Sequence, residues 1–202
     1  MKTVTYLALG DSYTIGEQVP LHESFPYQTV QLLRKSAACS GYRVMAPEIV
    51  AKTGWTTDEL SAAIDQTNFL PEYDMVSLLI GVNNQYRGRA VDEFEKEFEA
   101  LLQRAIGFAA GHAGNVYVLS IPDWGVTPFA KERDASKIAA DIDAYNGVCE
   151  RIAGKYKTAF IEITASQRAD AADAAFLAAD GLHPSGREYG KWAGKLGGVV
   201  RI

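Results

Sequence analysis

Two short stretches near opposite ends of the chain contain residues that could share one chemical task. Gly10-Asp11-Ser12 follows an apolar, β-prone run and ends on a hydroxyl, and near the other terminus Asp180 precedes His183 by three positions. A serine hydroxyl becomes a useful nucleophile when a positioned base accepts its proton, and an imidazole oriented by a carboxylate is such a base. The residue types therefore predict acyl transfer, with Ser12 as nucleophile, His183 as base and Asp180 as the group that orients it.

The elements that must position these residues alternate between strand and helix. Five apolar runs are expected to be strands, at residues 4–9, 42–51, 75–80, 116–121 and 159–163. Helical spacing or capping residues predict helices that begin near Ser24, Thr56, Val91, Ser136 and Ser185, with an alanine-rich segment at 167–178 that is helical at least in part. This alternation is typical of one parallel sheet covered by helices on both faces.

Polar or aromatic residues follow each expected strand. In open α/β sheets, ligands bind outside the carboxyl ends of the strands, so these residues are expected to meet at one edge. In chain order, they are Ser12, Gly54, Asn83 with Tyr86, Trp124, and Asp180 with His183. Together they supply a hydroxyl, flexible backbone, a side-chain amide, an apolar wall and a carboxylate–imidazole pair.

Composition narrows the class of protein. The chain has 202 residues, 48% hydrophobic and 22% charged, which indicates one folded domain over 1–202. A net charge of −5 gives no electrostatic reason to expect nucleic acid or an anionic membrane as partner. No apolar run approaches the ~20 residues of a transmembrane helix, and no signal peptide is visible, so a cytoplasmic location is expected. Cys39 and Cys149 are too few for a disulfide framework or a metal site and are interpreted as buried thiols.

Four blocks of sequence, taken in order, resemble the GDSL/SGNH hydrolase family of esterases and lipases. They are Gly10-Asp11-Ser12-Tyr13, the glycine at 54, Gly81-Val82-Asn83-Asn84, and Asp180 with His183. Tyr13 stands where the family name has leucine, which is a replacement common in the family. The departure from the family pattern is Asn84 in place of aspartate, and it puts the local hydrogen bonding in question more than the activity.

The resemblance implies a three-layer α/β/α sandwich with a five-stranded parallel sheet of the flavodoxin-like kind. It also implies the same catalytic roles for Ser12, Asp180 and His183. The oxyanion would be held by the N–H groups of Ser12 and Gly54 and by the side chain of Asn83. The expected substrate is a small-molecule ester, with no cofactor and no metal. The family's substrates include simple esters, lysophospholipids, thioesters and acetylated sugars, and neither the ester nor the oligomeric state can be chosen from the sequence.

Several alternatives stay open at this point. The same residues could transfer the acyl group to an acceptor other than water, or the domain could be a flavodoxin-like module that binds a small molecule without catalysis. Against a nucleotide as the ligand, the sequence has no Gly-x-Gly-x-x-Gly after the first expected strand and no Walker-type lysine motif. The α/β-hydrolase elbow is absent because Thr14 stands where its second glycine would be. Trp124 and Tyr86 are candidates for the substrate pocket or for the core, and Arg87 and Arg89 are interpreted as solvated.

Overall fold

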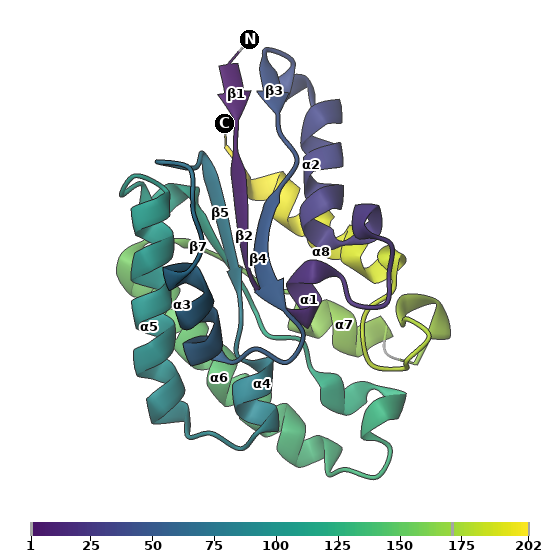
Figure 1. Cartoon of the computed structure of the whole chain (residues 1–202). Helices are drawn as coiled ribbons and strands as arrows, with labels where there is room; N and C mark the ends of the chain where they lie inside the picture. Colours follow the sequence, from purple (N-terminus) through teal and green to yellow (C-terminus); the bar gives the residue numbers. More distant parts are fainter. Residues whose placement is uncertain (1, 171, 202) are drawn as a thin grey trace.

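A parallel sheet of five strands forms the centre of the molecule (Figure 1). The computed structural model describes residues 2–170 and 172–201. The spatial order of the strands is β4 (Glu48–Lys52), β2 (Tyr6–Asp11), β5 (Met75–Leu79), β6 (Val116–Leu119) and β7 (Ala159–Ile161). In chain order this is the 2-1-3-4-5 arrangement of flavodoxin-like folds, whose order reverses beside the first strand. The sequence-predicted fold class is confirmed.

Two of the predicted strands are each divided in two. The first becomes β1 (Lys2–Val4) and β2, and the second becomes β3 (Tyr42–Val44) and β4, with β1 and β3 paired in a separate two-stranded sheet. At Thr5 the backbone N–H and the hydroxyl both donate to Asp74 Oδ2, each at 2.9 Å, so this N–H does not bond to a neighbouring strand. Between β3 and β4 lies Pro47, which has no N–H to donate.

Helices cover both faces of the sheet. On one face α2 (Phe25–Lys35) packs against α8 (Gly186–Val199), and on the other lie α3 (Thr57–Asp65), α5 (Val91–Phe108) and α6 (Ala135–Tyr156) (Figure 1). Short helices follow three of the strands: α1 (Ser12–Ile15), α4 (Val82–Tyr86) and α7 (Thr164–Asp170). None of the helices in residues 2–170 and 172–201 is long and apolar enough to cross a membrane.

One predicted helix start differs from the structure by a residue, and the alanine-rich segment is partly helical, as predicted. The helix expected to begin at Ser136 starts one residue earlier, because Asp134 caps it by accepting a hydrogen bond from Lys137 N at 2.9 Å. The alanine-rich segment at 167–178 is only partly helical: α7 ends at Asp170 and a single 3₁₀ turn covers Ala174–Phe176. Position 171 of that segment lies outside the described residues.

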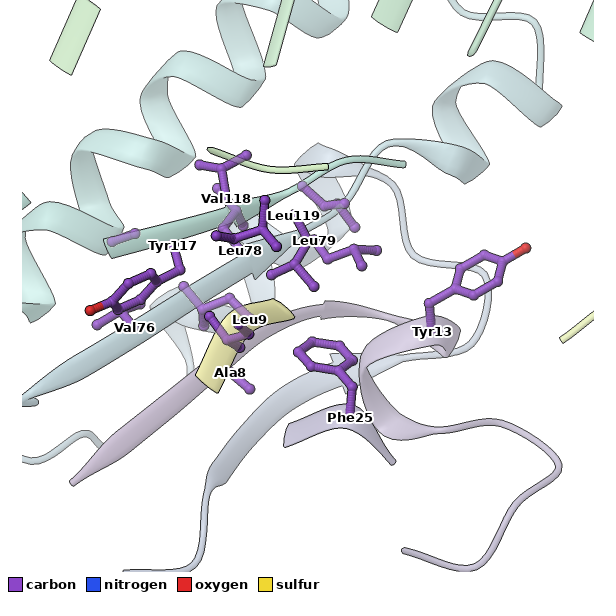
Figure 2. Packing of buried hydrophobic residues seen from close by; sticks show 14 of the residues in the cluster. Ala8, Leu9, Tyr13, Phe25, Val76, Leu78, Leu79, Tyr117, Val118 and Leu119 are labelled. Carbon is purple, nitrogen blue, oxygen red and sulfur yellow. The ribbon is translucent and has the colours of Figure 1, made fainter. Parts of the chain in front are cut away.

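Apolar side chains from the central strands fill the core and hold the strand ends in place. Leu9, Leu78 and Val118 come from β2, β5 and β6 and are completely buried, as Figure 2 shows in close view. All of β5 is buried, as its nearly continuous apolar run predicts. Phe25 of α2 and Tyr13 of α1 extend this cluster toward the carboxyl end of β2.

Candidate active site

The chain turns sharply between β2 and α1, and Ser12 is the first residue after the turn. Asp11 ends the strand, and its Oδ1 accepts a hydrogen bond from Tyr13 N at 3.0 Å, which caps the short helix. Gly10 is required here because a Cβ would lie 2.1 Å from Thr14 Oγ1 and 2.4 Å from the carbonyl oxygen of Leu79. The first motif therefore packs a tight strand-to-helix turn against the neighbouring strand β5.

His183 is held by Asp180 through both side chain and backbone. His183 Nδ1 lies 2.6 Å from Asp180 Oδ2, while Asp180 Oδ1 accepts hydrogen bonds from the N–H groups of Leu182 and His183, both at 3.0 Å. Gly181, between them, has φ +64°, a conformation that favours glycine. The three-residue spacing thus forms one compact acid–imidazole unit.

The carboxyl group of this unit is kept ionised. Burial raises the pKa of Asp180, but the hydrogen bonds from the His183 ring and from the backbone N–H groups of His183 and Leu182 outweigh it, so the pKa falls below its ordinary value. An ionised carboxylate only accepts, so it pairs with a protonated Nδ1 and leaves Nε2 as the ring nitrogen that can accept a proton.

An aromatic ring also lies against the imidazole. The ring of Tyr13 lies 5.3 Å from the His183 ring, centroid to centroid, and 6.2 Å from Trp192 of α8. This contact of Tyr13 was not predicted from the sequence. The position of Tyr13 directly after Ser12 was the available signal.

One pocket of about 190 Å³ brings the predicted site residues together. It is lined by all of them except Asp180, which lies behind His183; the lining includes Ser12, Gly54, Asn83, Tyr86, Trp124 and His183. Over the described ranges, no hydrogen bond joins the Ser12 hydroxyl to the His183 ring. Catalytic hydrogen bonds are often long in unliganded enzymes and tighten when substrate binds.

The side of the pocket that faces Ser12 is built from the loop after β4 and from α4. Gly54 has φ +84°, and Asn83 lies on the first turn of α4. Asn83 Nδ2 donates to the carbonyl oxygen of Trp55 at 3.0 Å. Arg87 Nη2 donates to the carbonyl oxygen of Gly54 at 2.6 Å, so its interpretation as a solvated residue was incomplete.

Asn84, the departure from the family aspartate, is completely buried and fully engaged with α3. Its Oδ1 accepts from Thr57 N at 3.1 Å and its Nδ2 donates to Thr57 Oγ1 at 2.6 Å. The local hydrogen bonding that the sequence left in question is therefore satisfied by an asparagine at this position.

An aromatic cluster forms the outer wall of the pocket. Trp124 is 5% exposed and its Nε1 donates to Gln85 Oε1 at 2.7 Å, whereas Tyr86 and Phe129 are each 48% exposed. The ring centroids of Tyr86 and Phe129 lie 5.2 and 6.1 Å from that of Trp124. A buried indole beside two half-exposed rings gives a mostly apolar surface.

The two cysteines are not among the residues that line this pocket. Cys39 and Cys149 are buried, as predicted. Within the part of the chain that the structure describes, no group of three or more His, Cys, Asp or Glu side chains could hold a metal ion.

Comparison with known proteins gives one family and a consistent fold. Residues 8–190 match the model of the GDSL-like lipase/acylhydrolase family. Similar solved structures include the α/β hydrolase enzyme LAE5 from the metagenome of Lake Arreo (19% identity, TM-score 0.72, covering 100% of this chain and 99% of that one). The acetylxylan esterase Axe2 from Geobacillus stearothermophilus shares 21% identity, with TM-score 0.74 and coverage of 100% and 97%.

A lipase/acylhydrolase from Enterococcus faecalis is also similar, at 20% identity and TM-score 0.68, with coverage of 98% of this chain and 94% of that one. No curated protein sequence matches the chain. At these identities the solved structures establish the shared fold.

Proposed function

We propose, on the premise that the chain belongs to the GDSL-like lipase/acylhydrolase family, that it is a serine esterase acting through an acyl-enzyme. The observation that carries the proposal is the meeting of two distant segments. Ser12 and His183 line the same pocket, and Asp180 binds the far side of the imidazole at 2.6 Å. A hydroxyl, a base and an orienting carboxylate are the groups that nucleophilic acyl transfer needs.

Acylation begins when Ser12 Oγ attacks the ester carbonyl carbon and His183 Nε2 takes the hydroxyl proton. The ionised Asp180 stabilises the imidazolium that forms. When the tetrahedral intermediate collapses, the bond to the alcohol oxygen breaks and His183 gives its proton to the departing alcohol. Water then attacks the acyl-enzyme, again with His183 as base, and the carboxylic acid leaves while the Ser12 hydroxyl is restored.

The developing oxyanion would be held by three donors. The N–H of Gly54 donates to no other group among the residues described, and Asn83 Nδ2 uses one of its two N–H bonds on Trp55, which leaves the second for the substrate. The Ser12 N–H completes the set. Preorganised donors of this kind are each worth about 10²–10³ in kcat.

The pocket favours a short, uncharged acyl group. Its volume of about 190 Å³ is below the ~300–1,000 Å³ of pockets that hold drug-sized ligands, and His183 is its only ionisable lining residue besides tyrosine among those described. Trp124 and Tyr86 are proposed as its substrate-binding wall. The similar Geobacillus enzyme is named for esterase action on acetylxylan, whose acyl group is short. Acetyl esters are therefore the expected first substrates.

The test is turnover of p-nitrophenyl acetate by the wild type, Ser12→Ala and Asp180→Asn. Ser12→Ala should keep the wild-type melting temperature and lose activity by several orders of magnitude, and Asp180→Asn should lose about 10⁴-fold in kcat. A fluorophosphonate should label Ser12 in the wild type, as read by peptide mass spectrometry. Ser40→Ala, an exposed serine outside the pocket, is the matched control and should behave as wild type.

Three results would contradict the proposal. Wild-type turnover by folded Ser12→Ala would remove the nucleophile, and loss of activity in chelator would point to a metal enzyme. Exclusive formation of a new ester when methanol competes with water would show that the acceptor is an alcohol, which is the transferase alternative.

A further inference from the structure

Arg87 connects α4 to the loop that carries Gly54. Arg87 directly follows the last residue of α4. Its Nη2 donates to the Gly54 carbonyl oxygen at 2.6 Å, and its Nη1 lies 3.4 Å from the carboxylate of Glu59 on α3. The side chain is 44% exposed and is not part of the pocket lining. Its contact is therefore with the backbone of the loop, and substrate would not touch it.

The Gly54 loop needs an external restraint because its key residue is a glycine. Trp55 N donates to the Lys52 carbonyl oxygen at 3.2 Å, which closes a turn with Gly54 as its third residue, and φ +84° at this position is typical of a type II turn. Glycine has the largest backbone freedom of any residue. Rotation about its two dihedral angles would turn the Gly54 N–H relative to the peptide plane that follows, and Gly54 lines the pocket.

Two side chains from one face of α4 supply that restraint. Asn83 holds the Trp55 carbonyl at 3.0 Å and Arg87 holds the Gly54 carbonyl at 2.6 Å. Residues four apart lie on the same side of a helix, and the Arg87 N to Asn83 carbonyl bond, 3.0 Å, shows that helical spacing is kept to this point. The two peptide planes that follow Gly54, one with the Gly54 carbonyl and one with the Trp55 carbonyl, are thus held from the same helix.

From these contacts the geometry points to Arg87 as a positioning residue of the oxyanion site. Its guanidinium holds the peptide plane between Gly54 and Trp55. This restricts rotation about the Gly54 dihedral angles, so that the Gly54 N–H and the Asn83 amide converge on one point. A charged donor makes a stronger hydrogen bond than a neutral one. Donors that are already oriented need no reorganisation as the charge develops, so the effect falls on the transition state. This inference rests on the proposed esterase function.

The test compares Arg87→Ala, Arg87→Gln and Arg87→Lys with Arg89→Ala. Loosening a donor costs less than deleting it, so the alanine and glutamine variants should lose roughly 10-fold in kcat with KM within about 2-fold of wild type. Lysine, a point donor without the guanidinium geometry, should retain more activity. Arg89 pairs with Asp58 at 2.6 Å and also links the end of α4 to α3, but it makes no hydrogen bond to Gly54. Its alanine variant should keep wild-type kcat.

Two further readouts separate positioning from a general structural effect. A boronic acid, which mimics the tetrahedral intermediate, should bind Arg87→Ala more weakly by the same factor as the loss in kcat/KM. Millimolar guanidinium chloride, compared with sodium chloride, should restore part of the kcat of Arg87→Ala and have no such effect on wild type. Melting temperatures identify the folded variants, and if the alanine variant does not fold, the glutamine variant takes its place.

The outcomes distinguish this inference from the proposed function. If Ser12→Ala is inactive but folded Arg87→Ala and Arg87→Gln turn over at the wild-type rate, the positioning role is overturned and the esterase stands. A kcat loss without weaker boronate binding, or an equal loss in Arg89→Ala, would overturn it as well. If Ser12→Ala keeps its activity, the proposed function itself fails, whatever the Arg87 variants do.

Discussion

At the scale of single residues, the most unusual side chain is the carboxyl next to the proposed nucleophile. Asp11 is completely buried, with Oδ1 bonded to Tyr13 N and Oδ2 without a partner in the described part of the chain. Burial raises the pKa of Asp11 to about 7, although hydrogen bonds from the backbone oppose the rise. A neutral carboxyl can still cap α1, because the cap uses one oxygen as acceptor.

This pKa predicts a pH dependence of stability. An unfolded aspartate loses its proton near pH 3.9, whereas folded Asp11 keeps it until about pH 7. Between these pH values the folded state binds more protons than the unfolded state. The stabilisation that comes from protonated Asp11 is therefore fully present below about pH 4 and is lost as the pH rises to 7. Asp11→Asn retains the cap oxygen and removes the titration. As the pH rises through this window, the unfolding free energy of Asp11→Asn should increase relative to that of wild type by up to about 1.4 kcal/mol per pH unit.

Urea denaturation of both proteins at pH 4, 5, 6, 7 and 8 measures the difference. The comparison cancels the titration of all other groups, which both proteins share. A constant offset between the two curves across this range would show that Asp11 titrates normally in the folded protein.

At the scale of secondary-structure elements, three helices are joined through one hydroxyl. Asn84 of α4 donates to Thr57 Oγ1 at 2.6 Å, and this hydroxyl in turn donates to Glu97 Oε2 of α5. Since a hydroxyl has a single proton, the chain of bonds has one direction. An amide at position 84 is therefore matched to the carboxylate at position 97.

This direction predicts that the family aspartate is unfavourable in this chain. In Asn84→Asp, two carboxylates compete for the one proton of Thr57, and the variant should lose roughly 1–2 kcal/mol of unfolding free energy. Glu97→Gln can donate to Thr57 Oγ1 from its amide and should recover part of that loss. A double-mutant cycle by urea denaturation measures the coupling. Additive effects of the two substitutions would show that the directional chain does not exist.

At the scale of the whole molecule, the last helix joins the two halves of the site. Trp192 of α8 is completely buried, with ring centroids 6.2 Å from both Tyr13 and Phe25. Its Nε1 donates at 2.8 Å to Glu188, whose other carboxylate oxygen has no hydrogen-bond partner among the described residues. The segment that carries His183 leads into this helix, so docking of α8 sets the position of His183, the proposed base, relative to Ser12, the proposed nucleophile.

Substitutions at Trp192 should therefore weaken the whole fold. Trp192→Ala removes a large core side chain and should cost about 3–5 kcal/mol of unfolding free energy. Trp192→Phe keeps most of the ring but leaves the buried Glu188 without its donor, at a cost of about 1–3 kcal/mol. Val199→Ala, at an exposed position of the same helix, is the control and should unfold like wild type. Wild-type stability of Trp192→Phe would show that Glu188 finds another partner.

Much of the fold and of the candidate site could be predicted from local patterns. The buried run of β5, the helical stripe of α5 and the turn at Gly181 carry their conformations in their own sequence. Parallel strands that alternate with helices place their carboxyl ends at one edge, so the predicted residues were expected to meet there. The compact unit of Asp180 and His183 could also be predicted, because a three-residue spacing is a local property of the sequence.

Only the tertiary structure decided the contacts that join distant segments. The packing of Tyr13 on His183, the bond from Arg87 to the Gly54 carbonyl and the pairing of Thr5 with Asp74 follow no sequence period. Each depends on how close two elements approach and on which polar group is left to satisfy. Periodicity reports which face of an element is buried, but the partner that covers this face is chosen by the packing of the complete chain.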